Sequence, residues 1–119
     1  MVVHVSDAPA SVLVTGSSRG LGRGVAERLA GSGYSVAIHY SSNRDAALET
    51  AEACARRAAN AAQKFPIVQG GIGSAAGREA LFSATLEALG HVDALVNNAG
   101  IAPRERADIT EARRRFLTR

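Results

Sequence analysis

Short apolar runs alternate along the chain with longer segments in which apolar residues recur every three or four positions. The short runs predict buried strands, because both faces of a parallel sheet are covered. The helical spacing predicts helices that lay one apolar stripe on that sheet. The predicted strands are 12–15, 35–40, 65–70 and 93–97, and the predicted helices are 21–31, 41–63 and 74–90, with another beginning near Thr110.

The predicted helices carry recognisable ends and inner faces. Asn43 or Ser42 is the expected N-cap of the second helix, and Ser74 that of the third. Two stripes are expected to face the sheet: Leu21, Val25, Ala26 and Leu29 in the first helix, and Leu48, Ala51, Ala55, Ala58 or Ala59, and Ala62 in the second. The small residues of the second stripe would let that helix lie close to the sheet.

Strictly alternating strands and helices with short connections predict an α/β fold with a doubly wound parallel sheet. Right-handed crossovers then give the strand order 3-2-1-4. The order reverses between the first and fourth strands, and ligands of such sheets bind beyond the carboxyl ends of the strands at that point. Two glycine-containing segments, TGSSRGLG (15–22) and NNAG (97–100), fall there.

The first segment has the glycine spacing G-x-x-x-G-x-G, at Gly16, Gly20 and Gly22. Gly16 allows a tight turn with positive φ, and the other two remove side chains where a phosphate and the helix approach the backbone. The helix N-terminus supplies free N–H groups for a pyrophosphate. Further donors are Ser17, Ser18 and Arg19. A P-loop is excluded because no Gly-Lys-Ser/Thr follows. A glycine-rich turn without a ligand is the alternative.

Together the two segments resemble the short-chain dehydrogenase/reductase family from about residue 11 to 101, and are similar to 3-oxoacyl-acyl-carrier-protein reductases among others. The resemblance implies a Rossmann-type fold that binds a dinucleotide. It places Asn98 near the adenosine-side ribose, and Ala99 and Gly100 beside the nicotinamide half. The residues it assigns to the pyrophosphate and adenosine ribose are Gly16, Ser18, Arg19, Gly20, Leu21 and Gly22.

The end of the second strand bears on the choice between NADP and NAD. NAD-binding proteins place an acid about 20 residues past the glycines. Residues 39–44 contain no acid, and the first one is Asp45. Donors in and near this stretch therefore favour NADP, and they are Ser41, Ser42, Asn43, Arg19 and Arg44. The absence of a ribose-binding carboxylate in residues 39–44 also counts against a methyltransferase. His39 is expected to be a packed strand residue.

One position departs from the family pattern. Members commonly carry an Asp just after the third strand, where it contacts the adenine, and this sequence has Gly71 there with Ile72 beside it. The adenine edge therefore loses an acceptor. Ile72 is the residue expected to touch the adenine.

The resemblance also implies a Ser, a Tyr-x-x-x-Lys pair and an Asn for hydride transfer, with the Tyr as acid/base. Four residues after Tyr34 and Tyr40 stand Ile38 and Arg44, and the single lysine is Lys64. No catalytic residue is therefore assigned.

Residues 1–119 are expected to be the N-terminal, dinucleotide-binding part of a truncated Rossmann domain. The parent, expected to be a homo-oligomer, would reduce a carbonyl such as a 3-oxoacyl thioester with NADPH. The alternatives are a non-catalytic binding module and a non-functional fragment.

Composition and charge exclude several classes of binding partner and site. The net charge is +3, but the basic residues are scattered and not interleaved with aromatics, which argues against nucleic acid. No apolar run approaches the roughly 20 residues of a membrane span, and no signal peptide is evident, so a cytoplasmic location is expected. The single Cys54 excludes an internal disulfide and a Cys-rich metal site. The basic tail around 113–115 fits either a solvated helix or a frameshifted end.

Overall fold

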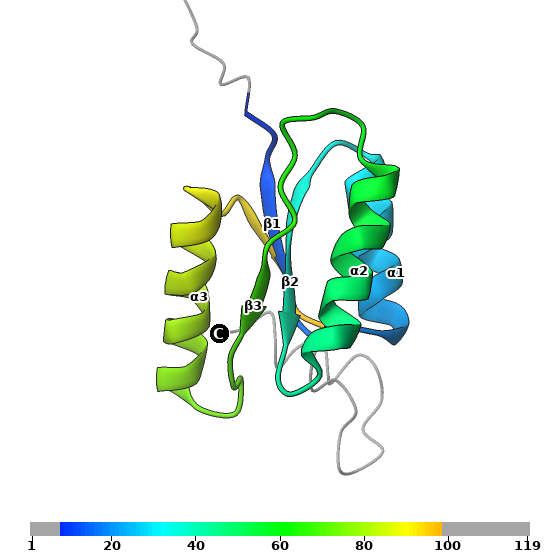
Figure 1. The fold of residues 1–119 in the computed structure, drawn as a ribbon. Coiled ribbons are helices and arrows are strands. Elements are labelled where there is room, and N and C mark those ends of the chain that lie inside the picture. The colour runs from blue at the N-terminus through cyan, green and yellow to red at the C-terminus, as the bar shows by residue number, and fades with distance from the viewer. Residues whose placement is uncertain (1–7, 99–119) are drawn as a thin grey trace, which may run out of the picture.

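The computed structural model describes residues 8–98, in which strands and helices alternate as predicted (Figure 1). The predicted helix near Thr110 lies outside the described residues. The elements are β1 (Ser11–Val14), α1 (Gly20–Gly31), β2 (Ser35–Tyr40), α2 (Arg44–Arg57), β3 (Ile67–Gln69), α3 (Ala75–Leu89) and β4 (Ala94–Val96).

The strands form one parallel sheet in the predicted order, β3-β2-β1-β4. Val14 pairs with Ile38 on one side and with Val96 on the other, so the carboxyl ends of β2, β1 and β4 lie side by side. In the part of the chain described here, β4 is an edge strand, and Leu95 is 54% exposed. The order reversal predicted from the sequence is therefore present between β1 and β4.

Helices cover both faces of the sheet: α1 and α2 lie on one face and α3 on the other (Figure 1). Alternate strand residues enter the two cores, as a strand with two covered faces requires. The core under α1 and α2 consists of Val12, Val14, Ala26, Ala30, Val36, Ile38, Tyr40, Ala47 and Cys54. The core under α3 consists of Leu13, Ala37, Val68, Leu81 and Leu89.

The predicted caps of α2 and α3 are confirmed. The Asn43 side chain accepts a hydrogen bond from the Ala46 N–H, and the Ser74 hydroxyl accepts one from the Gly77 N–H. Each satisfies one of the N–H groups that a helix start leaves without an intrahelical partner. Gly90 ends α3 in the left-handed conformation, with φ 84°.

The predicted inner face of α1 is confirmed at Ala26 and wrong at Leu21. The helix buries Gly22, Ala26 and Ala30, whereas Leu21 is 76% exposed. The line of closest approach to the sheet takes the smallest side chains, so the larger residues lie beside it. Val25 and Leu29 accordingly pack against the core from partly buried positions.

The predicted α2 is too long, and its stripe is also displaced. The helix ends at Arg57 rather than at residue 63, so Ala58, Ala59 and Ala62 lie outside it. Its buried residues are Ala47, Thr50, Ala53 and Cys54. Of the predicted stripe within the helix, Leu48 and Ala51 are partly buried and Ala55 is exposed. An alanine-rich helix offers little difference between faces, so its rotation is decided by packing.

Gln63 provides the physical reason for the early end of α2. Its side-chain oxygen accepts from the N–H groups of Ala59 and Asn60, at 2.6 and 2.8 Å. Its side-chain nitrogen donates to the carbonyls of Ala30 and Tyr34, at 2.8 and 2.7 Å. This buried amide therefore uses its full hydrogen-bonding capacity. It joins the loop after α2 to the end of α1 and the start of β2.

Replacing Gln63 with Ala is expected to lower the free energy of unfolding by about 2–4 kcal/mol, because buried donors and acceptors lose their partners. Urea denaturation followed by circular dichroism measures this change. The control is Gln69→Ala, which removes an exposed amide with one hydrogen bond, to the Ser41 carbonyl. Equal midpoints for the two variants would contradict the role given to Gln63.

Candidate functional site

The loop between β1 and α1 lies at the carboxyl end of the central strand, beside the end of β4. Gly16 has φ 63° and Gly20 has φ 62°, a region that residues with a Cβ rarely adopt. No atom lies within 4 Å of the position that a Gly20 Cβ would take. The two glycines therefore turn the chain sharply, and the space beside Gly20 is open.

Gly22 is required for a different reason. A Cβ at this position would overlap the Gly16 carbonyl and lie 2.7 Å from the Asn98 side-chain nitrogen. The first turn of α1 thus rests directly on the loop, as predicted for a glycine where the helix approaches the backbone. The contact also includes the segment after β4, through Asn98.

Hydrogen bonds connect the ends of β1 and β4. The Thr15 N–H donates to the Val96 carbonyl at 3.0 Å, and the Asn98 N–H donates to the Thr15 hydroxyl at 2.9 Å. The Thr15 hydroxyl lies 3.2 Å from Asn97 Oδ1. The Asn98 side chain donates to the Gly16 carbonyl at 3.3 Å. Asn97 and Asn98 therefore connect the segment after β4 to the loop after β1.

The start of α1 is suited to an anion. Arg19 is the N-cap residue in an extended conformation, and its side chain makes no capping hydrogen bond. The first turn contains no acidic residue. The N–H groups at this end and the helix dipole thus favour negative charge. Arg19 and Leu21 are exposed here, and Ser18 is partly buried, with its carbonyl accepting from the Thr50 hydroxyl at 3.0 Å.

Ser17 differs from the expectation that its donors face a phosphate. The side chain is buried, and its hydroxyl donates to the Val14 carbonyl at 2.7 Å while accepting from the His39 N–H at 2.8 Å. Its own N–H donates to the His39 carbonyl at 3.2 Å. Both donors of Ser17 are therefore used within the protein, and the residue shapes the loop from below.

The end of β2 presents exposed polar residues. Ser41 and Ser42 follow the strand, and Arg44 begins α2. All three are exposed, as is Asp45 in the first turn of α2. The donors predicted for this region thus lie at the same edge of the sheet as the glycine-rich loop.

The loop after β3 lies against the start of α3. A Cβ at Gly77 would overlap the Gly71 carbonyl, so this glycine allows the loop to approach the helix. Gly71 is exposed, with no atom near the position of a Cβ. Ile72 is partly buried against the core under α3, and its carbonyl accepts from the Arg78 side chain at 2.9 Å. The other two predicted site residues, Ala99 and Gly100, lie outside the described residues.

His39 is a residue whose role the sequence did not reveal. It is 2% exposed, which confirms the prediction that it packs in the strand. Its ring also contacts two loops, because Nδ1 lies 2.8 Å from the Gly16 nitrogen and Nε2 lies 2.7 Å from the Gly70 oxygen. A lone histidine in an apolar strand gives no sequence signal for these contacts.

The two tyrosines and the lysine do not meet beside the glycine-rich loop. Tyr40 is buried in the core under α1 and α2. Tyr34 and Lys64 precede β2 and β3, at the amino ends of the strands, opposite the glycine-rich loop. Residues 8–98 therefore hold no Tyr–Lys pair beside the candidate site.

A Ser–His–Asp group occurs at the amino ends of β1 and β4. His91 Nε2 lies 3.1 Å from Asp93 Oδ2 and 3.4 Å from the Ser11 hydroxyl. Both contacts involve the same ring nitrogen, whereas a catalytic triad places the acid on the other one. Ser11 is also buried, and its N–H donates to Asp93 at 2.8 Å. The group fixes the start of β4 against β1.

Cys54 is a free cysteine buried in the core under α1 and α2. Burial, reinforced by the nearby Glu27, raises the pKa of the thiol to about 11, so it stays protonated at neutral pH.

Within the described ranges, no group of three or more His, Cys, Asp or Glu side chains is placed to hold a metal ion. The three described helices lack the length and apolar character that a bilayer-spanning segment needs.

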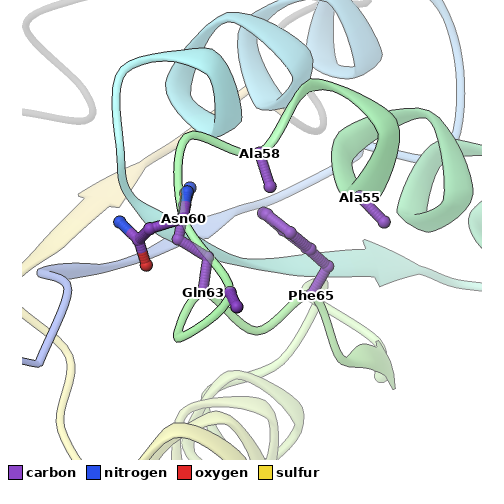
Figure 2. A pocket seen from close by; sticks show the side chains of 6 residues that line it. Ala55, Ala58, Asn60, Gln63 and Phe65 are labelled. Atoms are coloured by element: carbon purple, nitrogen blue, oxygen red, sulfur yellow. The ribbon is translucent and has the colours of Figure 1, made fainter.

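An open depression of about 460 Å³ lies beneath the end of α2 (Figure 2). Its lining residues are Ala55, Ala58, Asn60, Ala61, Gln63 and Phe65. Figure 2 shows the Phe65 ring extending toward Ala58. Phe65 precedes β3, so the depression lies at the amino ends of the strands, away from the edge where ligands of such sheets bind.

The sequence model of the short-chain dehydrogenase family matches residues 10–116. The chain belongs to this family. The parallel sheet with strand order β3-β2-β1-β4 and its covering helices match the Rossmann-type fold of this family. The family predicted from the two glycine-containing segments is confirmed.

Individual short-chain dehydrogenases are similar over most of the chain. The 3β-hydroxysteroid dehydrogenase 1 of Eggerthella lenta is 38% identical over 107 residues, 87% of this chain and 40% of that protein. The 3-oxoacyl-acyl-carrier-protein reductase FabG of Staphylococcus epidermidis is 38% identical over 91 residues, 76% of this chain and 36% of that protein. The chain thus spans about two-fifths of the length of these relatives.

A solved structure with a bound dinucleotide is also similar. The landomycin C-6 ketoreductase LanV, crystallised with NADP and rabelomycin, matches with a TM-score of 0.66 and 36% identity. The match covers 78% of this chain and 39% of that one. Together with the family, this likeness supports a nicotinamide dinucleotide as the cofactor.

Replacing Gly22 with Ala is expected to lower the free energy of unfolding by about 1–3 kcal/mol, because the added methyl group overlaps the Gly16 carbonyl. The matched control is Gly24→Ala in the same helix, where no atom lies within 4 Å of the new Cβ. That control should be neutral or stabilising, since Ala favours a helix over Gly. Urea denaturation of both variants measures the difference, and equal stabilities would show that the contact is not tight.

Proposed function

We propose that this chain is the dinucleotide-binding part of a short-chain dehydrogenase that uses NADP(H). In the complete protein it would support the NADPH-dependent reduction of a carbonyl to an alcohol. The observation that carries the proposal is the contact between Gly22, Gly16 and Asn98. It joins the start of α1, the loop after β1 and the segment after β4 at one point of the sheet edge.

The residues present fit a dinucleotide. The space above Gly20 and the acid-free start of α1 would receive the pyrophosphate, with N–H groups of Gly20, Leu21 and Gly22 and the exposed Arg19 as donors. Ser18 and Asn98 would flank the adenosine half, and Ala99 and Gly100 the nicotinamide half. Because its hydroxyl is already bonded to the protein, Ser17 would act on the ligand only through the loop it shapes.

The preference for NADP rests on charge. A 2′-phosphate beyond β2 would meet Ser41, Ser42 and Arg44, all exposed, with no carboxylate between residues 39 and 44. The NADP bound to the ketoreductase LanV supports the same choice. The reductase of Staphylococcus epidermidis supports a 3-oxoacyl thioester as one carbonyl substrate for the complete protein.

A second candidate is a dinucleotide-binding module without catalysis. It is favoured by one observation: residues 8–98 bring no Tyr–Lys pair to the site edge. Titration of the chain with NADPH, followed by an NADPH oxidation assay with a panel of ketones, tests both. Binding without turnover supports the module for this chain alone, and turnover supports an enzyme. Absence of binding would contradict both.

The chain is expected to bind NADPH more tightly than NADH, with the difference shrinking as salt screens the 2′-phosphate. Ser41→Asp should weaken NADPH binding by about tenfold through charge repulsion and leave NADH nearly unchanged. Calorimetric titration of both cofactors measures this. The control is Ser41→Asn, because asparagine has nearly the same shape as aspartate and carries no charge. An equal effect of the two variants on NADPH would exclude repulsion as the cause.

Gly71→Asp is expected to tighten binding of both cofactors by about threefold to tenfold, because it supplies an acceptor beside the adenine. The substitution should be tolerated, since Gly71 is exposed, its Cβ position is open and its φ is not positive. Gly73→Asp adds the same charge at another open position of the loop and should not tighten binding. Titration with NADPH and NADH distinguishes the two variants.

A further inference from the structure

His39 makes four hydrogen bonds, and three of them involve the glycine-rich loop. Its backbone N–H donates to the Ser17 hydroxyl, and its carbonyl accepts from the Ser17 N–H. Its ring Nδ1 faces the Gly16 N–H at 2.8 Å. The fourth bond joins ring Nε2 to the Gly70 carbonyl at 2.7 Å, in the loop after β3. The buried imidazole therefore connects the two loops that flank the end of β2.

The hydrogen-bond partners of the ring determine which of its two nitrogens carries the proton. A backbone N–H can only donate, so Nδ1 must accept from Gly16 and carries no proton. A backbone carbonyl can only accept, so Nε2 must carry the proton that is donated to Gly70. The neutral ring with hydrogen on Nε2 is the one form that satisfies both contacts.

The contact with Gly16 acts where the loop turns. The Gly16 N–H bonds to His39, and the Gly16 carbonyl accepts from the Asn98 side chain at 3.3 Å. The two peptide planes that flank the positive φ of Gly16 are thus each held by a side chain from a neighbouring strand end. The direction in which the chain leaves β1 toward Gly20 depends on both.

We propose that His39 is a positioning residue for the dinucleotide: through ring Nδ1 and the Gly16 amide it sets the loop that receives the pyrophosphate. This inference rests on the proposed function. The contact with Gly70 holds the loop after β3 and does not set the pyrophosphate loop. The two ring nitrogens therefore have separable effects on cofactor affinity.

Two conservative substitutions separate the contacts. The side-chain oxygen in His39→Asn is two bonds from Cβ, as Nδ1 is, so it can still accept from Gly16 while the bond to Gly70 is lost. The side-chain nitrogen in His39→Gln reaches the position of Nε2, so it can donate to Gly70 while the bond to Gly16 is lost. Each variant loses one ring hydrogen bond, so a purely structural role predicts similar effects on stability and on affinity.

NADPH titration and urea denaturation of the two variants test the proposal. His39→Asn is expected to bind NADPH within about threefold of the unsubstituted chain, and His39→Gln about tenfold more weakly, at similar midpoints of unfolding. Equal losses of affinity, or a greater loss in His39→Asn, would overturn the proposal. His39→Leu, which removes both ring contacts, should bind no more tightly than His39→Gln.

Nitrogen-15 NMR of the unsubstituted chain gives a readout that does not depend on the variants folding. The proposal requires the proton on Nε2 of His39, and a proton on Nδ1 would overturn it. If the unsubstituted chain fails to bind NADPH, the proposed function is contradicted. Hydrogen exchange of the Gly16 amide then decides the positioning role: faster exchange in His39→Gln but not in His39→Asn supports it, and equal rates overturn it.

Discussion

The close approach of the α1 start to the chain leaving β1 is the constraint on which the candidate site depends. Gly22 has no room for a Cβ, because the Gly16 carbonyl and the Asn98 side chain occupy that space. Only a glycine lets the helix begin this near to the sheet edge. As a result, the free N–H groups of the helix, the turn of the loop and the segment after β4 face one region.

The surrounding hydrogen bonds make that region rigid before any ligand arrives. Thr15 and Asn98 join the ends of β1 and β4, while Ser17 and His39 join the loop to β2. Each strand end next to β1 therefore contributes a side chain to the geometry of one short loop. A loop held in this way loses little conformational freedom on binding, which favours affinity. Thr15, Ser17 and His39 are buried at this edge, and their side chains form hydrogen bonds within the protein.

The two ends of the sheet have different characters. The carboxyl ends carry an acid-free helix start and exposed hydroxyl and guanidinium groups beyond β2. The amino ends carry the Ser11–His91–Asp93 group and the Gln63 amide, whose hydrogen bonds connect segments of the chain to one another. This asymmetry follows from the parallel sheet. Every crossover returns the chain to the amino end of the next strand, so the two ends of the sheet are built from different segments. The depression beneath α2 belongs to the second, structural end.

The sequence by itself determined the element order, the strand order and the family, and it predicted the position of the candidate site. The periodicities that define strands and helices can be read from neighbouring residues. Right-handed crossovers are common to parallel sheets and therefore fix the strand order. The glycine spacing marks positions where the backbone needs a positive φ or a close approach. The sequence also placed the cap of α3 at Ser74 correctly, and it gave Asn43 as one of two candidates for the cap of α2. Tertiary structure alone decided the rotation of the alanine-rich α2, the end of that helix at Arg57, and the roles of Gln63, Ser17 and His39. Those outcomes depend on hydrogen-bond partners 22 to 33 residues away or on small differences between helix faces, and neither leaves a mark in the local pattern.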